Sequence, residues 1–159
     1  KFLVGINLEG AVKGKKIESS ELFQICHGLN DQTKNIQIII LSAPDNFQSA
    51  ITMVKQMALN YVEVGYNTDK ILDVAALINH LDLIITPDTS IAHIASAFNK
   101  PVVTIHENNP DSFHLFAPIS SLNRTVFSKS KSSINDFSVS LLLQYCVELI
   151  SLKIEEEYE

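Results

Sequence analysis

The segment of this sequence best suited to bind an anion is a Pro-Asp turn followed by two hydroxyl residues. Asp88, Thr89 and Ser90 follow the apolar run 83–86 and Pro87, and a stretch with helical spacing begins directly after them. The first N–H groups of a helix have no partner inside the helix, and the helix dipole adds positive charge there. The N–H groups of residues 89–91 and the two hydroxyls therefore predict a phosphate site. The same residues also fit a plain helix start, with Asp88 as the N-cap and both hydroxyls in solvent.

Other polar residues around this segment have competing interpretations. His93 stands on the first turns of the same predicted helix, and its spacing alone favours a packed, hydrogen-bonded core histidine over a functional one. Lys13, Lys15 and Lys16 follow the first predicted strand, where they either meet a phosphate or form a solvated loop. Spacing does not choose among the three lysines.

Metal and disulfide chemistry are disfavoured by residue spacing. His106, Asp111 and His114 share one loop, but their spacing matches no common metal site and no thiol is near. We expect them to lie in a solvated loop and expect no metal cofactor. Cys26 and Cys146 each fall within an apolar helical pattern, so both are expected to be buried, reduced thiols.

The elements that position these residues alternate between strand-like and helix-like patterns. This alternation predicts an α/β fold, a doubly wound and mostly parallel Rossmann-like sheet of about six strands. Segments 8–18 and 107–123 are expected to be weakly structured. The expected helix caps are Ser19 or Ser20, Thr68-Asp69, and Asn135 or Asp136. Strands are expected at 2–7, 36–41, 61–64, 83–86, 102–106 and 124–128, and helices at 19–30, 44–59, 68–81, 89–98 and 137–153.

Fold logic also gives the place of a ligand. In such sheets, ligands bind outside the carboxyl ends of the strands, close to the point where the strand order reverses. The loops expected to form a site are therefore 7–18, 42–45, 65–69, 86–92 and 106–118.

Size and charge narrow the class of protein. The 159 residues fit one domain, and the net charge of −6 without a basic stripe argues against nucleic acid as a partner. Residues 137–154 form the most apolar long stretch, but Gln144, Glu148 and Lys153 interrupt it, so a membrane span is not expected. The chain opens on a predicted strand without a leading Met, which we interpret as part of a longer protein.

Three runs of the sequence, 71–78, 88–93 and 97–103, resemble glycosyltransferase family nine, the bacterial ADP-heptose:lipopolysaccharide heptosyltransferases. The C-terminal half of that family carries an Asp-Ser/Thr-Gly-x-x-His element, a small-residue helix and a Pro-Val-Val strand. Asn7-Leu8-Glu9-Gly10 is more weakly similar to the family's Asn-Pro-Gly-x segment. The resemblance implies the C-terminal half of a GT-B fold, with residues 1–153 as the nucleotide-sugar domain and 154–159 as an acidic tail.

The resemblance also implies roles for individual residues. Asp88, Thr89 and Ser90 would hold the phosphate and sugar of the donor, with His93 supporting their turn. One of Lys13, Lys15 and Lys16 would meet the diphosphate. The loop 65–69, with Asn67, would approach the nucleoside, although it equally fits an ordinary strand–helix turn.

The resemblance places the remaining chemistry outside these residues. The catalytic base would belong to the N-terminal half, as would the site for a lipid-linked saccharide acceptor, so the 159-residue chain is expected to bind donor weakly without turnover. No metal would be needed, because the helix dipole and cations stabilise the leaving diphosphate. The full-length protein would be cytoplasmic and peripheral to the inner membrane.

Two departures from the family pattern keep other functions open. Ser90 replaces a Gly, and either crowds the phosphate or requires a conformation that Ser disfavours. Glu107 stands where the family has a Gly-Pro-Thr-type loop, and it would repel a diphosphate. The alternatives are a GT-B domain for a UDP- or GDP-sugar, and a non-catalytic α/β nucleotide-binding or scaffold domain. The apolar residues of helix 137–153 are either buried within the domain or contact the other half or a second copy.

Overall fold

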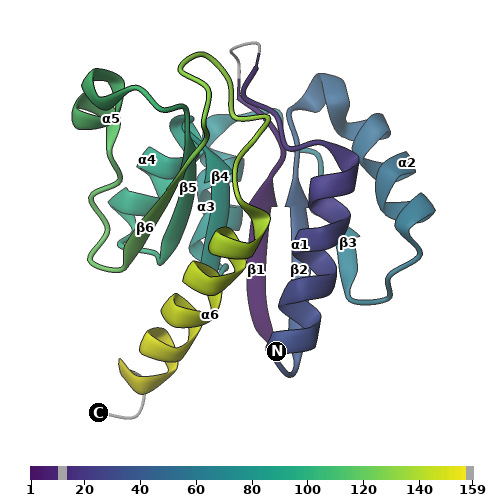
Figure 1. The fold of residues 1–159 in the computed structure, drawn as a ribbon. Coiled ribbons are helices and arrows are strands. Elements are labelled where there is room, and N and C mark those ends of the chain that lie inside the picture. Colours follow the sequence, from purple (N-terminus) through teal and green to yellow (C-terminus); the bar gives the residue numbers. More distant parts are fainter. Residues whose placement is uncertain (11–13, 157–159) are drawn as a thin grey trace.

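A computed structural model of the chain describes residues 1–10 and 14–156. They form one six-stranded sheet with helices packed against it (Figure 1). The strands are β1 (Phe2–Asn7), β2 (Ile36–Leu41), β3 (Val62–Val64), β4 (Leu83–Pro87), β5 (Val102–His106) and β6 (Asn123–Phe127). The helices are α1 (Ser19–Gln32), α2 (Phe47–Met57), α3 (Ile71–Asn79), α4 (Ser90–Ala97), α5 (Pro110–Phe116) and α6 (Val139–Glu156), and a 3-10 turn, η1 (Pro44–Asn46), precedes α2.

The sheet is fully parallel and doubly wound, as the alternation of patterns predicts. Its strand order is β3-β2-β1-β4-β5-β6, and every neighbouring pair runs parallel. The chain moves outward from β1 to β3, then returns to place β4 on the other side of β1. The strand order therefore reverses between β1 and β4, which is where a ligand site is expected.

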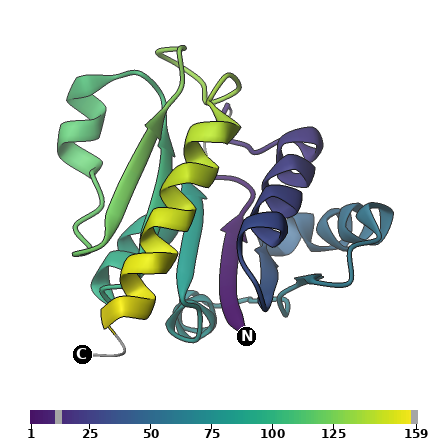
Figure 2. The same cartoon turned by 60° about the horizontal axis from the view of Figure 1, so that its bottom comes forward.

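Two apolar layers cover the sheet, one on each face. The larger core joins one face of the strands to α1, α2 and α6, and the smaller core joins the opposite face to α3 and α4. Figure 2 shows α6 running diagonally beside α1 over the first of these faces. Central strands such as β2 and β4 are apolar in nearly every position because both of their faces are covered.

Helix α6 packs on this domain along one side. Leu142, Cys146, Leu149 and Ile150 are buried, and Leu143 is half-buried, so the domain itself covers much of the apolar surface of the helix. Self-association through α6 stays a prediction. In the described residues, no helix has the length and apolarity needed to cross a bilayer.

Both cysteines are buried and free, as expected. Burial raises the pKa of the Cys26 thiol to about 12 and the pKa of the Cys146 thiol further, so both thiols stay protonated. They behave as small apolar core residues.

Several predicted helix ends are wrong, because local hydrogen bonds decide them. Glu18, and neither Ser19 nor Ser20, caps α1 through a reciprocal capping box with Glu21. Helix α3 begins at Ile71 after Lys70, so Thr68-Asp69 does not cap it. The Ser138 hydroxyl accepts the N–H of Leu141 at the start of α6, whereas Asp136 accepts the N–H groups of Lys129 and Ser130.

Two segments are more ordered than the sequence suggests. Segment 107–123 contains α5, whose start is set by the N-cap Asn109 and by Pro110 in the first turn. Helix α6 extends to Glu156, so the acidic segment 154–156 is helical, and the remaining tail residues 157–159 lie outside the described residues.

Candidate functional site

A cavity of about 590 Å³ opens at the carboxyl ends of the strands, at the reversal of strand order. Four predicted loops contribute to its lining, namely 7–18, 42–45, 65–69 and 86–92. The fifth, 106–118, supplies no lining residue among those described. The cavity is lined by Asn7, Glu9, Gly10, Ile40 to Asn46, Gly65, Tyr66, Thr68, Ile71, Val74, Leu77 and Thr89 to Ile91.

The cavity has an apolar wall and a polar edge. Ile40, Leu41, Val74 and Leu77 come from β2 and α3, and Tyr66 stands over them with its hydroxyl donating to the Asp73 carbonyl at 3.3 Å. The N-terminus of α4 also lines the cavity, at Thr89 and Ser90. Such a cavity is suited to a flat, mainly apolar ring at one end and an anion at the other.

The N-terminus of α4 is capped by Thr89, so the alternative of Asp88 as the N-cap is wrong. Thr89 is extended (φ −148°, ψ 174°), and its Oγ1 accepts the N–H of Ile91 at 3.2 Å. The Ile91 N–H is therefore occupied, which corrects the expectation that it is free for a ligand. Ser90 is exposed on the cavity wall as the first residue of α4.

Ser90 does not close the site in the way that its replacement of a Gly suggests. Its backbone is helical and its φ is not positive, so no conformation that disfavours serine is required. The cavity remains open beside it. The hydroxyl of Ser90 stays a candidate donor to an anion.

Asn7 ties β1 to the turn between β4 and α4. Its Nδ2 lies 3.0 Å from Thr86 Oγ1, 3.3 Å from Thr89 Oγ1 and 3.0 Å from the Glu9 carbonyl oxygen. Thr86 Oγ1 donates to the Pro87 carbonyl and lies 3.1 Å from Thr89 Oγ1. The Thr89 hydroxyl is thus part of a partly buried network, whereas the sequence had suggested a free donor.

Gly10 is required because the loop after β1 passes close to Thr89. A Cβ at this position would lie 2.8 Å from Thr89 Cγ2 and 3.6 Å from Lys15 Cβ, which is too close for the first contact. The glycine therefore lets the loop after β1 pack against the α4 cap.

Lys15 forms an ion pair with Asp88 beside the cavity. The Nζ–Oδ2 distance is 3.0 Å, and the two side chains are only 13% and 9% exposed. Neither residue lines the cavity itself. Lys16 is exposed and pairs with Glu9 through its backbone, and Lys13 lies outside the described residues. Among the described lysines of this loop, only Lys15 reaches Asp88.

His106 is buried against the same carboxylate, so the expectation of a solvated loop is wrong for it. Its side chain is 1% exposed, and its Nε2 lies 3.7 Å from Asp88 Oδ1. Burial lowers the pKa of the imidazole, and the Asp88 charge opposes this change only in part. Asp111 and His114 are exposed on α5 as predicted, and no group of His, Cys, Asp and Glu in the described residues is arranged to hold a metal.

Three other predicted positions lie away from the cavity wall. His93 is exposed, with its ring 6.4 Å from that of Phe116, so the expectation of a packed core histidine is wrong. Asn67 is exposed and does not line the cavity, although its neighbours Tyr66 and Thr68 do. Glu107 is half-buried at the end of β5 and is absent from the cavity wall.

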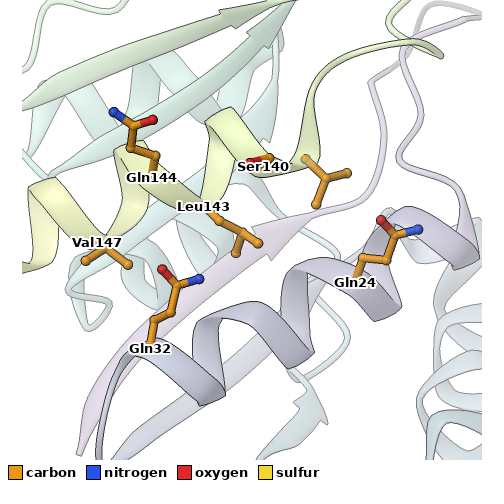
Figure 3. A pocket seen from close by; sticks show the side chains of 7 residues that line it. Gln24, Gln32, Ser140, Leu143, Gln144 and Val147 are labelled. Atoms are coloured by element: carbon orange, nitrogen blue, oxygen red, sulfur yellow. The ribbon is translucent and has the colours of Figure 1, made fainter.

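A second hollow, of about 470 Å³, lies between α1 and α6 (Figure 3). A Cβ on Gly28 of α1 would lie 2.3 Å from Cδ1 of the lining residue Leu143, so the glycine lets α1 and α6 pack closely beside this hollow. Its wall contains amide, hydroxyl and aliphatic side chains without any charged group, so it offers no evident chemistry. The wall is formed by Gln24, Gln32, Val139, Ser140, Leu143, Gln144 and Val147.

The burial of His106 predicts that acid destabilises the fold. The folded pKa lies below the ordinary value of 6.5, so below that pH the unfolded chain binds a proton that the folded chain resists. The free energy of unfolding should therefore fall between about pH 7.5 and 5.5, as measured by urea unfolding. In a His106→Gln variant the fall should be smaller. Equal slopes in the two proteins would contradict this prediction.

Comparison with known proteins gives a family match. The family model described as "Glycosyltransferase family 9 (heptosyltransferase)" matches residues 23–144. This range includes the α4 turn, Asp88 and His106. Among curated protein sequences, no significant match was found.

Solved structures share this fold at low sequence identity. E. coli heptosyltransferase WaaC with ADP matches with a TM-score of 0.73 and 17% identity, over 92% of this chain and 44% of that one. E. coli ADP-heptose lps heptosyltransferase II gives 0.70 and 18%, over 99% and 48%. A glycosyl transferase family 9 protein from Veillonella parvula gives 0.77 and 16%, over 94% and 46%. The chain thus spans slightly less than half the length of these proteins.

Proposed function

This chain belongs to glycosyltransferase family 9, and we propose that it is the donor-binding half of a two-domain enzyme that transfers a sugar from a nucleotide-sugar. By resemblance, we propose ADP-heptose as the donor and a lipopolysaccharide-type saccharide as the acceptor. The acceptor would bind through the other half, in a cytoplasmic protein at the periphery of the inner membrane.

The observation that carries this proposal is the cavity at the reversal of strand order, which is lined both by apolar residues of β2 and α3 and by the α4 N-terminus. We place the nucleoside against Ile40, Leu41, Val74 and Leu77, with Tyr66 beside it. We place the diphosphate at the N-terminus of α4, where the dipole and the Ser90 hydroxyl favour an anion. Asp88 and Lys15 lie next to that end and would meet the phosphate and sugar.

The chemistry proposed for these residues is stabilisation of the leaving diphosphate. As the bond between sugar and phosphate breaks, negative charge grows on the diphosphate oxygens. The α4 dipole and the Lys15 ammonium would both stabilise this charge. The carboxylate of Asp88 holds Lys15 in place before the donor arrives. The base that deprotonates the acceptor would come from the other half.

Calorimetric titration of the chain with ADP, UDP and GDP tests the proposal. We expect ADP to bind about tenfold more tightly than the other two, which corresponds to about 1.4 kcal/mol. A Ser90→Gly variant should keep the preference for ADP, because the residues placed against the nucleoside are unchanged, while loss of the Ser90 hydroxyl should weaken the binding of all three nucleotides alike.

The other outcomes of this titration separate the alternatives. A preference for UDP or GDP would keep the glycosyltransferase donor half and change the nucleotide. Failure of all three to bind, in both the unchanged chain and Ser90→Gly, would reject donor binding by this domain and favour a scaffold role.

A further inference from the structure

The Asp88 carboxylate faces two cationic or protonatable groups, and only one of them is bound to it. Its Oδ2 accepts from Lys15 Nζ at 3.0 Å, whereas its Oδ1 faces His106 Nε2 at 3.7 Å, beyond hydrogen-bond distance. The His106 Nε2 has no hydrogen-bond partner in the part of the chain that the structure describes. A buried polar atom without a partner is costly, so this arrangement calls for an explanation.

The His106 ring is held in place by aromatic neighbours. Phe113 of α5 packs edge-on against it with ring centroids 5.2 Å apart, and Phe127 of β6 lies at 6.3 Å. The ring is 1% exposed, so its Nε2 does not reach solvent. The Asp88 carboxylate is the acidic group within reach of this nitrogen.

In the free protein, burial and the charged groups around His106 together favour the neutral form of its imidazole. Burial is the largest cause that lowers its pKa, and the charge of Lys15 and the proximity of His93 act in the same direction. Asp88 and Glu107 act in the opposite direction. Lys15 is the member of this set that the proposed function assigns to the diphosphate.

We propose that His106 is a second partner of Asp88, which binds a proton from solvent and pairs with the carboxylate when an anionic ligand draws Lys15 away. The inference rests on the proposed function for the nature of that ligand, the diphosphate of a nucleotide-sugar. His106 is then a positioning residue, because it acts on the donor through Asp88 and does not touch it.

Electrostatics gives the reason for this exchange. Once Lys15 pairs with a diphosphate, Asp88 would be left as a largely buried carboxylate without a counter-charge, next to further negative charge. Loss of the Lys15 charge also removes one of the causes that disfavour the imidazolium. A shortening of the Nε2–Oδ1 distance by less than about 1 Å would make a charge-assisted hydrogen bond. The donor would thus enter together with about one proton.

A ligand-free experiment tests the coupling directly. The NMR titration of the His106 ring is followed in the unchanged chain and in Lys15→Met, which removes the lysine charge. We expect the midpoint to rise by about one pH unit in Lys15→Met. Lys16→Met, in the same loop but exposed, should leave it unchanged. His106→Gln assigns the signal, and an unchanged midpoint in Lys15→Met would overturn the inference.

A second experiment adds the ligand and separates the two proposals. ADP-ribose carries a diphosphate esterified at both ends, so its own charge stays constant near neutral pH. Calorimetry in two buffers of different ionisation enthalpy should show uptake of a fraction of a proton up to about one proton per ADP-ribose, and His106→Gln should abolish it. Binding without uptake, or uptake that persists in His106→Gln, would overturn this inference alone. Absence of binding would overturn the proposed function, and the inference with it.

Discussion

A Lys15→Met variant is expected to bind ADP about 10- to 100-fold more weakly than the unchanged chain, a loss of about 1.4 to 2.8 kcal/mol. The Lys15 side chain is only 13% exposed, so water screens its attraction for a diphosphate less than on an open surface. Charge-assisted hydrogen bonds of this kind contribute about 1.5 to 3 kcal/mol. Methionine keeps an unbranched side chain that is one heavy atom shorter and carries no charge. Calorimetric titration measures the difference.

Lys16→Met is the matched control for this prediction. It removes the same charge from the same loop at an exposed position that does not reach Asp88, so affinity for ADP should change by less than about twofold. Raising the salt concentration should weaken binding to the unchanged chain more than binding to Lys15→Met. If Lys15→Met binds ADP as tightly as Lys16→Met does, Lys15 does not meet the diphosphate.

The sheet and the place of the cavity could be predicted from the sequence because both follow from local patterns. The run of β2, apolar except at Gln37, and the apolar strand before Pro87 each indicate a strand buried on two faces. When strands and helices alternate in a parallel sheet, the loops that follow the strands all lie at the carboxyl ends of the strands. Four of the five loops expected at a site meet at the cavity for this reason.

The polar network at this edge could not be predicted in the same way, because its partners are distant in sequence. Asn7 bonds to Thr86 across 79 positions, and Lys15 pairs with Asp88 across 73. No local spacing specifies such pairs. One signal was available, namely that Asn7 is a polar residue at the end of an otherwise apolar strand.

The prediction of a solvated loop was wrong for His106, because this residue belongs to a buried strand. It ends β5 as the last residue of an apolar run, and the fully buried pattern of that strand continues through it. The grouping of His106 with Asp111 and His114 by proximity in sequence obscured this continuity. Strand membership was the better guide to its burial than the residue type.

The two departures from the family pattern have different structural consequences. Ser90 stands on the cavity wall in ordinary helical backbone, so it alters the surface that meets a ligand without straining the turn. Glu107 is half-buried behind His106 and outside the cavity wall. Its charge raises the pKa of the His106 imidazole and so favours protonation of the ring. Neither residue blocks the cavity.

An Asn7→Ala variant is expected to lower the free energy of unfolding by about 2 kcal/mol and to weaken ADP binding as well. Asn7 is 5% exposed, and its amide donates at the point where β1, β4 and the α4 cap meet. Its loss removes one hydrogen-bond donor from the Glu9 carbonyl and one from the Thr89 hydroxyl. Buried polar groups that lose a hydrogen-bond partner cost about 1 to 3 kcal/mol of stability. Urea unfolding and ADP titration measure the two effects.

The two effects of Asn7→Ala should be linked, because the same amide fixes the position of Thr89, whose hydroxyl caps the helix that would meet the diphosphate. Asn30→Ala, at an exposed position near the end of α1, is the control and should change the free energy of unfolding by less than about 0.5 kcal/mol. A loss of stability without any loss of ADP affinity would mean that the Asn7 network supports the sheet alone. An Asn7→Ala variant as stable as Asn30→Ala would mean that water replaces the amide, and that the turn before α4 holds its shape without β1.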